Sequence, residues 1–125
     1  MKSLKPITLA KKIAQLCSDK KGEDIVILNV SKISSFCDYF VIVTALVEQH
    51  INSLSEHLMM EIKKVYGVKP SRVEGKEFKK WVVLDYGAVI VHLMTPEMRE
   101  FYALERVWSK GKKIKYETAS KKSNK

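Results

Sequence analysis

The apolar pattern in the first half of the chain predicts a helix, two strands and a second helix. Residues 8–18 predict a helix, because apolar side chains recur there at the three- and four-residue spacing of one helical face. Residues 24–30 and 39–44 are β-rich and continuously apolar at their centres, as in strands that are buried on both faces. Residues 48–66 return to helical spacing and are followed by Gly67, the glycine expected just after a helix.

The second half of the chain predicts a short strand and then a hairpin. Residues 71–74 follow a proline and are expected to form a short edge strand, and residues 75–79 a polar loop. Two apolar runs, 80–85 and 88–94, are separated only by Tyr86-Gly87. Such a pair of runs with a glycine between them is the pattern of a hairpin with a two-residue turn.

A last helix completes the predicted fold. Thr95 suits the N-cap and Pro96 the first helical position, and the helix is expected to run to about Ser109 before Gly111 stops it. The element order is α-β-β-α-β-β-β-α. It predicts an α/β fold with a mixed five-stranded sheet flanked by helices, in which helices on one face would leave the other partly open.

The hairpin has two faces of different character. With Tyr86-Gly87 as the turn, Trp81 faces His92 and Val83 faces Ile90. One face is wholly aliphatic and belongs to the core, with Val82, Leu84, Val89, Val91 and Leu93. The other is mixed, with Trp81, Val83, Asp85, Ala88, Ile90, His92 and Met94. A mixture of Trp, Met, aliphatic and polar residues is typical of a protein–protein contact. Coverage by the chain's own last helix is the alternative, and the residue pattern leaves the two even.

Composition indicates a single soluble domain. The 125 residues are 46% hydrophobic and 30% charged, as in globular proteins. No apolar run approaches the roughly 20 residues of a membrane span, and the amphipathic N-terminus shows no secretory signal, so a cytoplasmic location and no membrane partner are expected. In that compartment Cys17 and Cys37 are expected to be reduced.

Positive charge is concentrated at the C-terminus. The net charge is +9, yet residues 109–125 hold seven lysines against one acid. The predicted organisation is a domain over residues 1–109 followed by a basic, mobile tail over residues 110–125. A lysine-rich tail attracts polyanions, and rRNA is a natural partner. A purely solubilising tail is an equally good interpretation.

Catalytic chemistry finds little support in the chain. His50 and His57 are seven residues apart, too far for the four-residue spacing of a helical metal pair. A two-metal nucleotidyl-transfer site would require a second carboxylate two residues after the first. Neither Asp38 nor Asp85 is followed by one at that spacing. No P-loop, GxGxxG or GxSxG sequence occurs. We therefore expect a protein that is not an enzyme, with no catalytic residues, metal or cofactor.

Four motifs together resemble one known family. The runs DYFVIVT (38–44), VEG (73–75), WVVLDYGAVIVHLM (81–94) and REFYALERVW (99–108) are similar to those of the ribosomal silencing factor, or Iojap, family. The resemblance covers about residues 5–109. It implies a sheet related to that of nucleotidyltransferases but without their active-site carboxylates. It also implies binding to ribosomal protein fourteen on the large subunit, which blocks joining of the small subunit and represses translation when nutrients are scarce. Organellar relatives assist large-subunit biogenesis, which is the alternative function.

The resemblance also implies a set of partner-binding residues. Carried over position by position, the set comprises Trp81, Asp85, Tyr86, His92, Met94, Arg99, Tyr102 and Glu105. It favours an exposed Trp81 over one covered by the chain itself. Because an apolar sheet face that awaits a partner can also pair with itself, a homodimer of the free protein is a further expectation.

Overall fold

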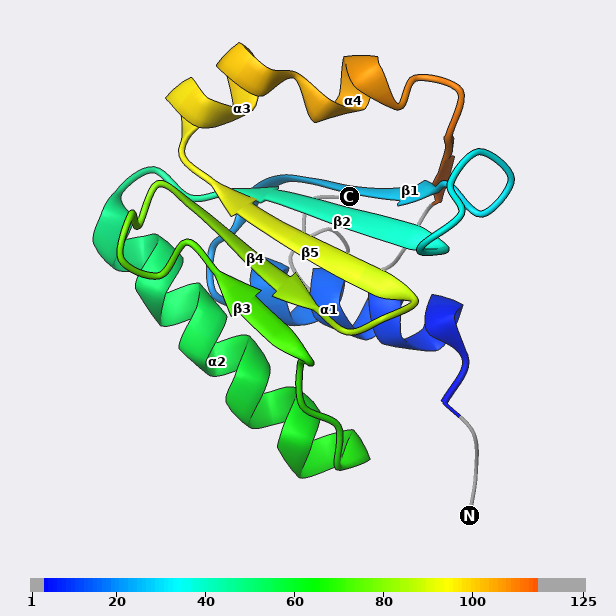
Figure 1. Ribbon diagram of the computed structural model, residues 1–125. Coiled ribbons are helices and arrows are strands. Elements are labelled where there is room, and N and C mark those ends of the chain that lie inside the picture. The colour runs from blue at the N-terminus through cyan, green and yellow to red at the C-terminus, as the bar shows by residue number, and fades with distance from the viewer. Residues whose placement is uncertain (1–3, 115–125) are drawn as a thin grey trace, which may run out of the picture.

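The protein is an α/β sandwich with helices on both faces of one sheet. The computed structural model describes residues 4–114, and Figure 1 shows its layers. Helices α1 (Pro6–Asp19) and α2 (Glu48–Tyr66) cover one face, and the shorter α3 (Pro96–Tyr102) and α4 (Leu104–Val107) lie over the other. No helix among the described residues is long and apolar enough to cross a membrane.

The sheet is mixed, as predicted, and has the order β3-β4-β5-β2-β1-β6. Strands β2 and β5 run parallel at its centre, and every other neighbouring pair is antiparallel. The strands are β1 (Glu23–Asn29), β2 (Tyr39–Thr44), β3 (Arg72–Glu74), β4 (Trp81–Asp85), β5 (Val89–Met94) and β6 (Lys112–Ile114). The predicted order of elements is confirmed up to α3, but the sheet has six strands where five were predicted.

Strand β6 is the unpredicted one, and it lies inside the segment predicted to be a tail. Its three residues pair antiparallel with β1, with Ile27 opposite Ile114. The lysine-rich run gave no strand signal, because a single isoleucine supplies its only apolar contact with the main core. Residues 112–114 therefore belong to the sheet, and residues 115–125 of the predicted tail lie outside the described residues.

The hairpin turn sits one residue later than predicted. Tyr86 N–H donates to the Val89 carbonyl at 2.9 Å, so the two turn residues are Gly87 and Ala88. Gly87 has φ +88°, which glycine adopts without the steric cost of a Cβ. Its N–H donates to Asp85 Oδ1 at 2.8 Å. The aspartate therefore stabilises the turn, a local role that the hydrophobic pattern did not reveal.

The later turn also shifts the pairing of β4 with β5. Trp81 lies opposite Met94, and Val83 opposite His92, where the predicted partners were His92 and Ile90. The error is two residues. Because side chains alternate between the faces with a period of two, the predicted division of the hairpin into two faces is still correct.

The predicted last helix is in fact two helices, separated by Ala103. This residue takes a left-handed conformation, with φ 47° and ψ 53°, and its N–H donates to the Arg99 carbonyl. Alanine carries no signal of such a break, since it is a strong helix former and the left-handed conformation costs it roughly 1–2 kcal/mol. The break directs Leu104 and Trp108 back towards the sheet, where both pack against its second core.

Helix α1 also differs from prediction, since it begins at Pro6 and not at residue 8.

Each face of the sheet has its own hydrophobic core. The main core, under α1 and α2, is aliphatic apart from one cysteine and contains all five residues of the predicted core face of the hairpin. The second core, under α3 and α4, is smaller and borders on aromatic rings. Its buried members are Leu28, Val30, Cys37, Phe40, Ile42, Ile90 and Met94.

Candidate partner-binding surface

Four rings form a row that leads from the second core to solvent. Ring centroids are 5.9 Å apart for His92 and Trp81, 4.8 Å for Trp81 and Tyr102, and 4.9 Å for Tyr102 and Phe101. Exposure rises along this aromatic row, from 8% for His92 through the half-buried Trp81 to 46% for Tyr102 and 76% for Phe101. The row joins the hairpin to α3, and its outer rings present apolar surface to the outside.

The inner end of the row is held by a hydrogen bond. Trp81 Nε1–H donates to His92 Nδ1 at 3.1 Å. Because an indole nitrogen can only donate, the acceptor nitrogen must be unprotonated and the proton of the neutral ring lies on Nε2. Burial lowers the pKa of His92 to about 4, which keeps the ring neutral. Phe40 contacts it edge-on at 5.0 Å between centroids, so the imidazole is a fixed support for Trp81.

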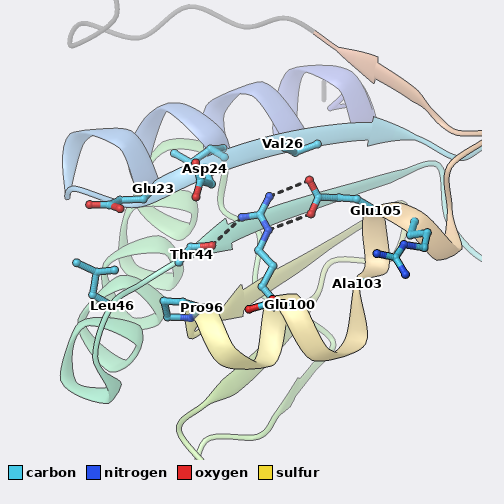
Figure 2. Close-up of a pocket in the computed structure, with 12 residues that line it drawn as sticks. Glu23, Asp24, Val26, Thr44, Leu46, Pro96, Glu100, Ala103 and Glu105 are labelled. Atoms are coloured by element: carbon cyan, nitrogen blue, oxygen red, sulfur yellow. Dashed lines mark hydrogen bonds and ion pairs between the residues drawn. The ribbon is translucent and has the colours of Figure 1, made fainter.

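A second set of contacts ties the two short helices to the sheet. Arg99 of α3 forms a two-pronged ion pair with Glu105 of α4, and Figure 2 draws its contacts with the labelled Glu105 as dashed lines. The two nitrogen–oxygen distances are 3.0 and 3.1 Å, and a third nitrogen of Arg99 donates to Thr44 Oγ1 at 2.8 Å. The arginine side chain is only 11% exposed and the glutamate 34%. Such a bidentate pair is stronger and more directional than a surface ion pair, so it fixes the angle between α3 and α4.

The same arginine borders an open cleft of about 880 Å³ between β1, β2 and α3. Glu23, Asp24 and Glu100 add further carboxylates around it (Figure 2). Within residues 4–114, no three His, Cys, Asp or Glu side chains are placed to hold one metal ion. The cleft therefore presents a set of carboxylates around one nearly buried arginine, Arg99.

The predicted partner-binding residues do not all lie on one surface. Trp81 and Tyr102 form part of the aromatic row. His92 is buried, and Met94 is fully buried beneath the row, so neither presents surface in this conformation. The prediction that both contact a partner directly therefore does not fit the structure, because α3 folds back over them.

The remaining predicted residues lie elsewhere. Arg99 and Glu105 form the ion pair beside the cleft, and Asp85 stabilises the hairpin turn at the far end of β4. Tyr86 packs against the main core, on the other side of the sheet. Its buried hydroxyl has no hydrogen-bond partner among the described residues, and burial raises its pKa to about 12.

Phe101 is the surface residue that sequence reasoning missed. At 76% it has the highest exposure of the large apolar side chains between residues 4 and 114. It follows Met98 by three residues, a spacing that predicts one shared helical face. Met98 instead packs against the second core while Phe101 points outward, and the sequence holds no signal that separates them.

Known proteins are similar to this chain in sequence and in fold. A protein from Haemophilus influenzae is 37% identical over 71% of this chain and 86% of its own length. Another, from Zymomonas mobilis, is 34% identical over 87% of this chain and 81% of its own length. Both are named ribosomal silencing factor RsfS. A crystal structure of a Chromobacterium violaceum protein superposes with a TM-score of 0.81 at 29% identity, covering 90% of this chain and 92% of that one.

The chain is also similar to a protein whose name refers to mitochondria. The mouse protein named mitochondrial assembly of ribosomal large subunit protein 1 is 30% identical over 78% of this chain, which spans only 43% of that protein. The family model described as "Ribosomal silencing factor during starvation" matches residues 3–125, nearly the whole sequence. By this match and by its relatives, the chain belongs to the ribosomal silencing factor (RsfS) family.

Proposed function

We propose that this chain binds the large ribosomal subunit through ribosomal protein fourteen, blocks joining of the small subunit and so represses translation when nutrients are scarce. Membership of the family supports the ribosomal role. The observation that carries the proposed surface is the aromatic row, whose exposure rises to 76% at Phe101 on a fixed support.

The outer rings have the properties of a binding hot spot. Trp81 is held in place by His92, so little side-chain entropy is lost when a partner covers it. Tyr102 and Phe101 add exposed aromatic area beside it, and aromatic side chains dominate the energetics of protein contacts. The proposed contact residues are therefore Trp81, Tyr102 and Phe101, with His92 and Met94 supporting them from beneath.

Steric exclusion requires no chemical step by the protein. A domain held on the intersubunit face occupies volume that the incoming small subunit needs, so occupancy alone prevents joining. The fixed geometry between α3 and α4, set by the Arg99–Glu105 ion pair, serves this mechanism because it holds the proposed contact residues of α3 in place.

A second function is favoured by one relative. The printed name of the mouse protein refers to assembly of the mitochondrial large subunit. The same surface could act earlier, on a precursor particle, with the same partner. Depletion of the protein would then cause precursors of the large subunit to accumulate, whereas a pure silencing factor leaves their level unchanged.

The proposal is tested by subunit joining with purified, mature subunits. The unaltered protein is expected to reduce formation of the joined ribosome, and Phe101→Glu to restore it by placing a charge in a desolvated contact. Met60→Glu is the matched control, since Met60 is 60% exposed on α2, across the sheet. Joining that proceeds equally with and without the unaltered protein would contradict the proposal.

A further inference from the structure

The loop between β3 and β4 combines lysines with an exposed aromatic ring. This basic loop comprises residues 75–80 and includes Lys76, Lys79 and Lys80. Phe78 stands among them with 53% of its surface exposed. Its ring makes no contact with another aromatic residue in the described part of the chain, so much of the ring surface stays available to a ligand.

The basic loop has a defined shape. Lys79 N–H donates to the Gly75 carbonyl at 2.8 Å, and Thr95 N–H donates to the Lys80 carbonyl at 3.0 Å. Gly75 has φ +88°, and a Cβ at this position would collide with the Trp81 carbonyl. Lys79 also has a positive φ, of 66°. The backbone of the loop is therefore fixed before any partner arrives, which lowers the entropic cost of binding.

No lysine of the basic loop forms an ion pair with a carboxylate of the described residues. Between residues 4 and 114, only Arg72 and Arg99 form ion pairs with carboxylates. The ammonium group of Lys80 lies 5.9 Å from the centroid of the Phe78 ring, within the range of a cation–π contact. The loop thus presents an aromatic face and several unpaired cations in one place.

We propose that the basic loop binds unpaired RNA, with Phe78 stacked on a base and Lys76 and Lys79 in contact with phosphates. Proteins recognise single-stranded RNA by this combination, because every base offers a π-face and every nucleotide a negative charge. An anionic membrane fits less well, since Glu77 lies next to the ring and one phenylalanine buries little apolar area in a bilayer.

The place of the basic loop gives the RNA contact a use. Lys80 directly precedes Trp81, the residue of β4 in the aromatic row. Figure 1 shows the connection between β3 and β4 at the end of the sheet where β5 leads into α3. A protein bound on the aromatic row and an RNA beside it can therefore be held together. The inference rests on the proposed function only for the identity of this RNA as ribosomal.

The test compares two paired neutralisations in the full-length chain. Binding of a short, labelled single-stranded RNA is measured at several salt concentrations. Lys76→Gln/Lys79→Gln is expected to weaken binding about tenfold and to flatten the salt dependence by about 1.4 in slope, as two lost phosphate contacts require. Lys63→Gln/Lys64→Gln removes the same charge from exposed positions on α2 and is expected to have a much smaller effect.

Phe78 supplies the second arm of the test. Phe78→Ala is expected to weaken RNA binding about tenfold, and Phe78→Trp to retain it, because both aromatic rings stack. Equal losses from the loop pair and the α2 pair would overturn the inference, since they would show general charge attraction. Binding of the same variants to vesicles of phosphatidylcholine with phosphatidylserine is measured in parallel. Weaker vesicle binding with unchanged RNA binding would overturn the inference in favour of a membrane contact.

The same variants separate this inference from the docking proposal. Phe78→Ala is expected to bind purified ribosomal protein fourteen as the unaltered chain does, while its RNA binding falls. The reverse result, lost protein binding with intact RNA binding, would overturn the inference by making the basic loop part of the protein contact. Thermal unfolding of each variant shows that the fold is retained.

Discussion

The two faces of the sheet have been built in different ways. Under α1 and α2 the buried members of the core are aliphatic apart from one cysteine, and residues such as Ile13, Leu54 and Leu58 are fully buried. Under α3 and α4 the contacts include an imidazole, an indole and an ion pair, and the outermost ring is 76% exposed. The first face holds the fold together by burial. The second holds a few side chains in fixed positions, and this is the arrangement that a docking surface requires.

The comparison is tested most strongly by a cavity in the main core. Leu58 of α2 is fully buried. Leu58→Ala is expected to lower the free energy of unfolding by about 2–5 kcal/mol, through lost burial and an unfilled cavity. Chemical denaturation measures this loss. Below the unfolding transition, the variant should still bind the large subunit, and a change under about 1 kcal/mol would contradict the role assigned to this face.

The second face is expected to be the one that is sensitive to acid. The pKa of His92 is about 4 in the folded protein against 6.5 in the unfolded chain, so the unfolded chain takes up the proton first as pH falls. Stability is then full above pH 6.5, falls by about 3 kcal/mol between pH 6.5 and 4, and changes no further through this group at lower pH. His92→Gln should lose less stability over the same range. Parallel pH profiles for the two proteins would refute the assignment.

The ion pair of the second face is expected to have a smaller effect. Arg99→Met leaves the Glu105 carboxylate without its bidentate partner and should cost about 2 kcal/mol of unfolding free energy. Arg72→Met is the matched control, because Arg72 and Glu74 are 70% and 60% exposed. Surface pairs of that kind contribute about 0–1 kcal/mol. Similar losses for the two variants, measured by denaturation, would show that burial of the Arg99 pair has no consequence.

The same contrast explains which features could be predicted from sequence. The main core follows from short-range periodicity, and the alternation of Val82, Leu84, Val91 and Leu93 placed them correctly even though the hairpin register was wrong by two residues. Periodicity is a local signal, and it survives local errors.

The second face depends on events that no local pattern encodes. The left-handed Ala103 divides the last helix and directs Leu104 and Trp108 onto the second core. Strand β6 exists because β1 offers it an edge. The family resemblance predicts Trp81 and Tyr102 as contact residues, and the surface proposed from the aromatic row adds Phe101 to them, with His92 hydrogen-bonded to Trp81 from beneath.

The central claim is that the aromatic row is the surface without which the protein does not stay on the large subunit. Cosedimentation with large subunits in a sucrose gradient tests it directly, with Phe101→Glu compared against Met60→Glu. Both replace an exposed apolar residue by a charge, on opposite faces of the sheet. We predict that the unaltered chain and Met60→Glu sediment with the large subunit and that Phe101→Glu stays at the top of the gradient. Cosedimentation of Phe101→Glu at the level of the unaltered chain would contradict the account.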